Sequence, residues 1–147
     1  MSKPELIAIN HDDYHAMHIG RLPDGRQFFL TSPFVPAYGG TAGREFVALF
    51  LFDHRGVFLE ARIDDLGTRA GLIPEQARSI YEQRLADLGE VKFCRIEVQP
   101  FELTRFGTVF GLVPRVPEGE DDVWAVELQP GNFMAFFEPW DSGEYDT

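Results

Sequence analysis

Apolar residues at every second position dominate this sequence, and this period constrains the fold more than any other feature. Successive side chains of a strand point to opposite faces, so a period of two indicates a half-buried β-strand. Residues 57–64 show it clearly, with Val57, Leu59, Ala61 and Ile63 on one face. The same pattern predicts strands at residues 16–22, 26–31, 44–52, 57–64, 91–99, 107–113, 123–129 and 132–138.

Short turn motifs join neighbouring strands of this set. Residues 22–25 read Leu-Pro-Asp-Gly, residues 53–56 read Asp-His-Arg-Gly, and residues 129–132 read Gln-Pro-Gly-Asn. Proline presets its own φ and glycine accepts positive φ, so these residue types favour tight turns. Because hairpins dominate, we expect an antiparallel sheet and an α+β fold.

One strand departs from the alternation. The segment Phe46–Phe52 is apolar at every position. A strand that is buried on both faces reads this way. We therefore expect a central strand, with a helix over one face and either loops or another subunit over the other.

A single helix is predicted at about residues 74–88. Pro74 suits a first turn and Gly89 suits a helix end. The apolar stripe consists of Ala77, Ile80, Tyr81, Leu85 and Leu88. The opposite face is expected to carry Glu75, Arg78, Glu82 and Arg84. The predicted fold is thus a twisted, mostly antiparallel sheet of seven or eight strands with this amphipathic helix packed on one face.

The length of the chain is typical of one domain. It has 147 residues, with no internal repeat and no linker. We expect a single domain over residues 1–147, with the acidic tail at 139–147 packed on the body. The 14 Phe residues indicate a thick, dry core or a buried contact surface.

Negative charge is concentrated toward the C-terminus. The net charge is −11, and from Val116 onward there are nine acidic residues and no Lys or Arg. Such a field repels nucleic acid and anionic lipid, and it favours cationic partners or metal ions. The alternative is that the acids serve solubility alone. In either case we expect no nucleic-acid partner.

Compartment is inferred from features that the sequence lacks. A single cysteine excludes an intrachain disulfide, and residues 1–10 have no long apolar stretch of the signal-peptide type. The longest apolar run, Phe46–Phe52, is far shorter than the ~20 residues that a membrane-spanning helix requires. We expect a cytoplasmic protein without a membrane partner.

Metal binding has weak candidates in His11, Asp13 and His15. Imidazole and carboxylate groups form a suitable ligand set. However, His15 and His18 would point to opposite faces if they shared a strand. We therefore expect a polar N-terminal segment and no metal site.

Catalytic motifs are also missing. Cys94 alternates with Ile96 and Val98, which favours a buried, unreactive thiol. The glycine-rich segment 39–43 lacks the Lys-Ser/Thr ending of a P-loop, and no serine lies in a G-x-S-x-G elbow. We predict no catalytic residue and no cofactor.

Aromatic residues suggest a contact surface in two segments. The chain end sets two aromatics among acids, and the 32–43 loop carries two more. The candidate partner-binding residues are Trp140, Asp141, Glu144, Tyr145, Phe34 and Tyr38. Trp140 and Tyr145 either anchor the tail to the body or contact a partner.

Four stretches resemble a family of short bacterial proteins. They are IGRLPDGRQFF, ALFLFDHRGVFLEARI, FGLV and FEPWDSGEYDT. Some members of the family carry the label "formate hydrogenlyase regulatory protein". The resemblance covers most of the chain and implies one compact domain that includes the tail. It implies no catalytic or binding residue.

Two classes of function follow from these features. The first is a non-enzymatic cytosolic interaction or regulatory protein with an acidic surface. Its partner would be a protein with a basic surface or a second copy, forming a homodimer. The alternative is a small-molecule- or metal-binding domain, including an enzyme of unrecognised type, with a pocket between the sheet and the loop at residues 32–43.

Overall fold

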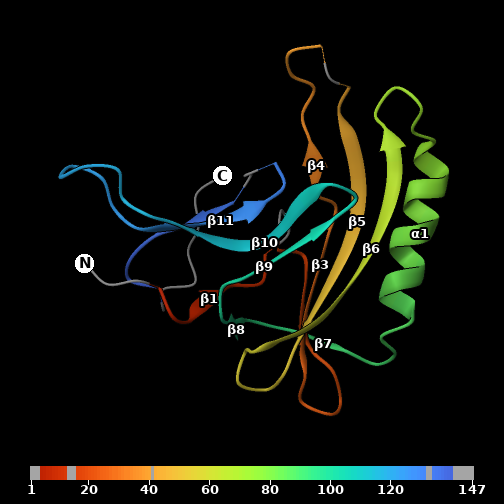
Figure 1. Cartoon of the computed structure of the whole chain (residues 1–147). Helices are drawn as coiled ribbons and strands as arrows, with labels where there is room; N and C mark the ends of the chain where they lie inside the picture. The colour runs from red at the N-terminus through yellow and green to blue at the C-terminus, as the bar shows by residue number, and fades with distance from the viewer. Residues whose placement is uncertain (1–3, 13–15, 41, 132–133, 141–147) are drawn as a thin grey trace.

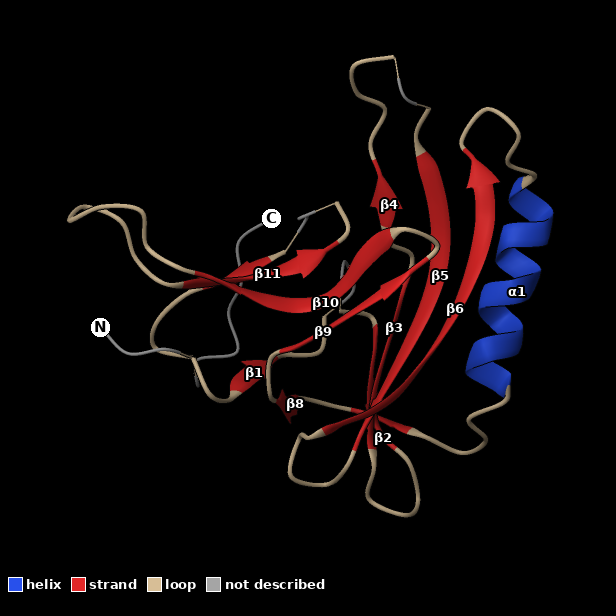
Figure 2. Cartoon of the chain, in the orientation of Figure 1, coloured by secondary structure: helices blue, strands red, loops and turns tan. Residues whose placement is uncertain are grey.

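Antiparallel sheets and one helix form the described part of the chain (Figures 1 and 2). The computed structural model describes residues 4–12, 16–40, 42–131 and 134–140. In these residues there are twelve strands in three sheets and one helix, α1. The α+β class is confirmed, whereas the prediction of one sheet with seven or eight strands is wrong.

The largest sheet contains six strands, and every pairing in it is antiparallel. They are β2 (His18–Arg21), β3 (Gln27–Thr31), β4 (Phe34–Val35), β5 (Arg44–Phe52), β6 (Phe58–Thr68) and β7 (Lys92–Phe93). The order is β4-β5-β3-β2-β7, with β6 on the free side of β5. Both β3 and β4 pair with β5, so together they act as one interrupted strand along it.

A second sheet has four strands and a third has two. The four-stranded sheet consists of β9 (Phe101–Arg105), β10 (Thr108–Arg115), β11 (Ala125–Gln129) and β12 (Ala135–Phe136). The small sheet pairs β1 (Ile7–Ile9) with β8 (Ile96–Val98). The strands β1, β4 and β9 were not predicted. The first two have only three and two residues, too few for a period to show, whereas the alternation of Phe101 and Leu103 in β9 was overlooked.

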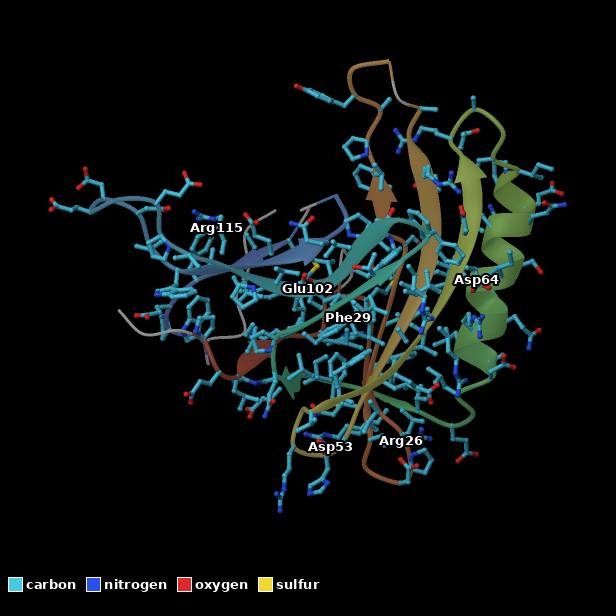
Figure 3. The ribbon with its side chains drawn as sticks, in the orientation of Figure 1. Arg26, Phe29, Asp53, Asp64, Glu102 and Arg115 are labelled. Atoms are coloured by element: carbon cyan, nitrogen blue, oxygen red, sulfur yellow. The ribbon has the colours of Figure 1, made fainter. Side chains whose placement is uncertain are left out.

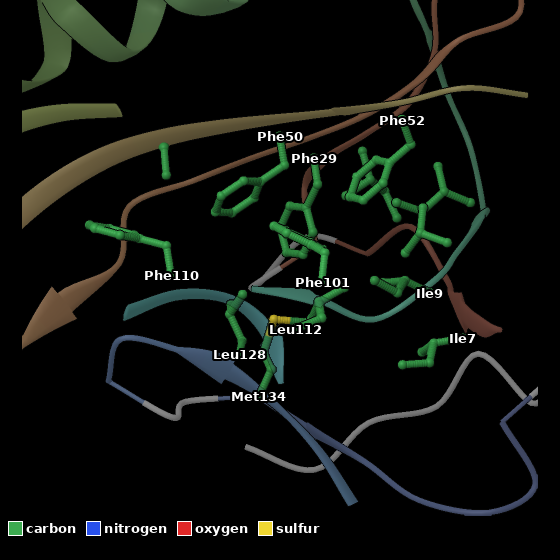
Figure 4. Packing of buried hydrophobic residues seen from close by; sticks show 14 of the residues in the cluster. Ile7, Ile9, Phe29, Phe50, Phe52, Phe101, Phe110, Leu112, Leu128 and Met134 are labelled. Atoms are coloured by element: carbon green, nitrogen blue, oxygen red, sulfur yellow. The ribbon is translucent and has the colours of Figure 1, made fainter. Parts of the chain in front are cut away.

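The central strand β5 is buried on both faces, as its apolar run predicts. Phe46, Ala48, Phe50 and Phe52 belong to the core between the two larger sheets, while Val47, Leu49 and Leu51 belong to the core under α1. Figure 4 shows Phe50 and Phe52 facing Phe101 and Leu112 of the second sheet. The second cover is therefore a sheet of the same chain, and the expectation of loops or another subunit is wrong.

Phenylalanine rings fill the space between these two sheets. Phe101 lies with its ring centroid 4.4 Å from Phe58, 4.9 Å from Phe50 and 5.3 Å from Phe52. The first of these pairs is stacked and the other two are edge-on, which are the favourable aromatic geometries. The high Phe content thus serves the core, which is one of the two roles that the composition predicts.

The predicted strand at 91–99 is broken in the structure. Its ends form β7 and β8, which belong to different sheets. Cys94 lies between them, half-buried, and its backbone N–H donates to the Ile19 carbonyl at 3.2 Å. Placing Cys94 within a strand was therefore wrong, because alternation cannot show where a chain passes from one sheet to another.

The helix α1 (Pro74–Ala86) begins where predicted and ends two residues early. Ile80, Tyr81 and Leu85 pack against the sheet, but no residue of α1 is fully buried. Figure 1 shows α1 on the opposite side of the large sheet from the second sheet, and its side chains reach His18 of β2 through Tyr81 and Asp64 of β6 through Arg84. No helix of the described residues combines the length and apolar character needed to cross a membrane.

Two predicted turns are confirmed by their hydrogen bonds. The Gly25 N–H donates to the Leu22 carbonyl at 3.0 Å, and the Gly56 N–H donates to the Asp53 carbonyl at 3.0 Å. Both glycines have positive φ, +92° and +90°. Figure 3 shows these turns, marked by Arg26 and Asp53, at the same end of the large sheet.

Candidate functional site

A pocket of about 530 Å³ lies between α1 and the face of the large sheet. Strands of the sheet supply its floor and one wall, and α1 and the segment before it supply the other wall. Its lining residues are His18, Ser32, Glu45, Val47, Leu66, Leu72, Ala77, Arg78, Tyr81, Glu82 and Leu85. The volume falls in the range that is typical of small-molecule sites.

Strand register explains why these side chains share one face. His18 lies opposite Leu30, and Leu30 lies opposite Leu49, so all three point toward α1. Positions two residues along the strands, Ser32 and Val47, share this face. Val47 is 1% exposed, so it forms an apolar floor in the middle of the sheet.

A histidine–tyrosine pair joins the sheet to the helix inside this pocket. His18 Nδ1 lies 2.6 Å from the Tyr81 hydroxyl oxygen, and that hydroxyl donates to the Leu30 carbonyl at 3.3 Å. Since tyrosine has one hydroxyl hydrogen, His18 Nδ1 is then the donor of the shorter bond. This hydrogen-bond pattern leaves His18 Nε2 as an acceptor.

Burial keeps both members of the pair uncharged. The pKa of His18 is lowered from 6.5, first by desolvation and then by the nearby charge of His11. Desolvation raises the pKa of Tyr81 to about 12. The pair therefore supplies neutral hydrogen-bonding groups at neutral pH, and Tyr81 is not a phenolate nucleophile.

An ion pair closes another part of the pocket wall. Arg69 Nε donates to Glu45 Oε1 at 2.8 Å, and the Glu45 side chain is only 16% exposed. The Arg69 guanidinium also lies 5.6 Å from the ring centroid of Phe34, in cation–π range. Phe34, a predicted partner-binding residue, is thus half-buried beside the pocket and linked to it through Arg69.

Two charged residues of α1 line the pocket without a partner. Arg78 and Glu82 are one helical turn apart and both are exposed. Neither side chain makes an ion pair or hydrogen bond with any residue that the structure describes. The prediction that they lie on a face opposite the apolar stripe is wrong, because at 100° per residue Arg78 directly follows Leu85 around the helix.

Arg84 was also predicted on the far face, and this too is wrong. Its guanidinium makes two hydrogen bonds with the Asp64 carboxylate of β6, at 2.8 and 3.0 Å. Figure 3 shows Asp64 on the side of β6 next to α1. At 100° per residue, Arg84 lies between residues of the apolar stripe and therefore faces the sheet. Its charge is accommodated there because the long side chain reaches the Asp64 carboxylate.

Of the remaining predicted contact residues, Tyr38 and Trp140 lie in the described part of the chain. Tyr38 is 86% exposed in the loop between β4 and β5. Trp140 is half-buried and packs against the core between the sheets, and its carbonyl accepts a hydrogen bond from the Ala8 N–H at 2.9 Å. Asp141, Glu144 and Tyr145 lie outside the described residues.

The weak metal candidates do not form a described cluster. His11 is exposed, stacks on Phe93 with centroids 5.8 Å apart, and has Nε2 2.8 Å from the Met17 carbonyl oxygen. Asp13 and His15 lie outside the described residues. Over the part of the chain that is described, no three His, Cys, Asp or Glu side chains are placed to hold a metal ion.

The sequence analysis placed a pocket between the sheet and the loop at residues 32–43, whereas the structure places it between the sheet and α1, with Ser32 as the one lining residue from that loop. His18 was considered only as a metal ligand, and Tyr81 only as part of an apolar stripe. One signal was present, since Tyr81 is the one residue of that stripe with a hydroxyl group. A buried tyrosine hydroxyl usually has a hydrogen-bond partner, but the sequence does not say which strand supplies it.

Comparison with protein-family models, curated proteins and solved structures found no match to this chain.

Proposed function

We propose that this protein binds a small molecule in the pocket between α1 and the large sheet. The observation that carries the proposal is the pocket itself, in which an apolar floor meets a few convergent polar groups. The floor and walls include Val47, Leu66, Leu72 and Leu85, and the polar groups include His18 and Tyr81. The loose cover that α1 provides leaves this volume unfilled by the chain's own described side chains.

Filling the pocket tests this function. Ala77 lines the pocket from α1, whereas Ala86 is exposed on the same helix and does not line it. Ala77→Phe, or the smaller change Ala77→Leu, should weaken the binding of the fluorescent apolar probe anilinonaphthalenesulfonate at least about tenfold, and Ala86→Phe should leave it unchanged. Circular dichroism shows whether each variant is folded.

The same variants can also contradict the proposal that the pocket binds a small molecule. If the folded Ala77 variants bind the probe as tightly as the unmodified protein does, the pocket is not its site and the proposal is wrong. A thermal-shift screen of metabolites completes the test. A true ligand stabilises the unmodified protein and Ala86→Phe, but not the Ala77 variants.

Interaction with a protein partner is a second candidate, favoured by the connection between β10 and β11. This segment extends away from the sheets (Figure 1). It exposes Glu118, Glu120 and Asp121, with Val116 62% exposed. Acidic groups around an exposed apolar residue suit a partner with a basic surface.

Salt dependence tests this second function. Capture of a partner should weaken between low and moderate salt and should be lost in a variant that neutralises Glu118, Glu120 and Asp121. Asp122 is left intact, because it pairs with Arg115 at 2.8 Å within the chain. Light scattering identifies the case in which the partner is a second copy. Capture that is insensitive to both salt and the neutralised variant contradicts this function.

A further inference from the structure

We infer that the pocket is built for a small zwitterion with an apolar side chain, such as a free apolar α-amino acid. This inference rests on the proposed function, since it names the class of ligand for the same pocket. It is carried by the charge pattern of the lining residues. One cation and one carboxylate remain unpaired beside an apolar floor, and every other ionisable group of the lining is neutral or paired.

The unpaired charges are Arg78 and Glu82. They lie on neighbouring turns of α1 and both line the pocket. An arginine that precedes a glutamate by four residues is in the less favourable order for a helical ion pair. In the described structure the two side chains make no ion pair, so each is free to contact a ligand.

The other polar groups add no net charge. Glu45 is neutralised by Arg69 at 2.8 Å, and burial keeps His18 and Tyr81 uncharged. A multiply charged anion would meet one guanidinium and two carboxylates, and a simple cation would face Arg78. A ligand with one carboxylate and one ammonium group satisfies both free charges, with Arg78 binding the carboxylate and Glu82 the ammonium group.

The apolar lining of the pocket favours a ligand with an apolar side chain. Val47 is fully buried, and Leu66 and Leu85 are half-buried beside it. An apolar side chain placed over Leu66 and Leu85 would remove further apolar surface from water. Ser32 Oγ and His18 Nε2 have no described partner and lie at the same pocket. They supply hydrogen bonds to a single polar group without demanding a charge.

The test compares three compounds with one apolar body. L-phenylalanine carries both charges, hydrocinnamate carries only the carboxylate, and β-phenylethylamine carries only the ammonium group. Calorimetry should show phenylalanine binding at least about tenfold more tightly than either analogue, since one charge-assisted contact is lost in each. Phenylalanine should also displace anilinonaphthalenesulfonate from the pocket.

Two variants that each remove one charge test whether Arg78 binds the ligand carboxylate and Glu82 binds the ammonium group. Arg78→Gln should weaken phenylalanine and hydrocinnamate but not β-phenylethylamine, and Glu82→Gln should weaken phenylalanine and β-phenylethylamine but not hydrocinnamate. Glu75→Gln is the matched control, because Glu75 is an exposed carboxylate of α1 that does not line the pocket. This variant should bind all three compounds as the unmodified protein does.

Different results would contradict the proposed ligand class and the proposed binding pocket. If the probe binds and is weakened by Ala77→Phe, but phenylalanine binds no better than its analogues or fails to displace the probe, the ligand class is wrong and the pocket stands. If the probe is insensitive to the Ala77 variants, the proposed function itself is wrong.

Discussion

His18 Nδ1 and the Tyr81 hydroxyl oxygen lie 2.6 Å apart, although 63 residues separate them in the sequence. The contact ties strand β2 to helix α1 across the pocket. It is also the one hydrogen bond between two described side chains that line the pocket. It therefore links the stability of the fold to the shape of the proposed binding site.

Removing the tyrosine hydroxyl tests this link. Tyr81→Phe deletes the bonds to both His18 and the Leu30 carbonyl, and it should lower the free energy of unfolding by about 1 kcal/mol. Urea denaturation measures the change. Tyr38→Phe is the control, because that side chain is 86% exposed and its loss of a hydroxyl should have no effect. Equal stability of both variants would contradict the importance of the pair.

The lowered pKa of His18 predicts a stability loss in mild acid. The unfolded chain takes up a proton near pH 6.5, whereas folded His18 does so only at lower pH, mainly because of desolvation and secondly because of His11. The unfolded state thus binds more protons, so this contribution to stability is complete above pH 6.5 and is lost as pH falls through the folded pKa.

Unfolding in urea at a series of pH values between about 7.5 and 5 measures that loss. His18→Gln should remove the His18 part of the pH dependence, whereas His54→Gln, in an exposed turn, should retain it. A pH profile of His18→Gln that matches the unmodified protein would show that His18 does not contribute.

The Arg84–Asp64 ion pair is expected to hold α1 against β6. Its side chains are 26% and 27% exposed, and its two hydrogen bonds have the geometry of the stronger arginine–carboxylate pairs. Arg84→Gln should therefore cost about 1 kcal/mol, at the upper end for a partly exposed pair. Arg78→Gln on the same helix should change stability by less than about 0.5 kcal/mol, because Arg78 has no described partner.

A double-mutant cycle identifies the source of that cost. Asp64→Asn alone, Arg84→Gln alone and the two together are compared by urea denaturation. A coupling energy near zero would show that Arg84 stabilises the helix through its own packing and not through Asp64.

Two turn glycines with the same backbone conformation should differ sharply in their tolerance of alanine. A Cβ on Gly25 would have only the Cβ of His54 nearby, at 3.9 Å, whereas a Cβ on Gly56 would lie 2.4 Å from the Glu97 carbonyl oxygen. Gly25→Ala should cost about 1 kcal/mol through its positive φ, and Gly56→Ala should cost at least about 3 kcal/mol. Thermal unfolding compares them, and equal costs would mean that β8 can move away.

Much of the local structure could be predicted from the sequence. The strand at 44–52 has the predicted bounds, the two turns that end in Gly25 and Gly56 form, and the helix begins at Pro74. These features depend on periodicity and on the φ preferences of single residues, which neighbouring sequence determines. The division into sheets depends instead on which distant strands pair. The register Ile7 to Val98, for example, has no local signal.

The candidate site was less predictable than the fold. Arg78 and Arg84 look alike in the sequence, yet one lines the pocket and the other pairs with Asp64. The difference arises because α1 lies across the sheet face, where Arg84 reaches Asp64 of β6 while Arg78 lies beside the pocket, so the two sides of its apolar stripe meet different surroundings. Helical phase predicts which residues are neighbours on a helix, but not how far the helix is shifted across a sheet.

The sequence by itself determined most of the longer strands, two of the turns, the start of the helix and the burial of β5 on both faces. Only the tertiary structure decided that a second sheet covers one face and that a pocket remains between α1 and the other. The physical reason is that backbone preference and side-chain alternation act between near neighbours. Core packing, in contrast, is settled by the fit of surfaces that come from distant parts of the chain.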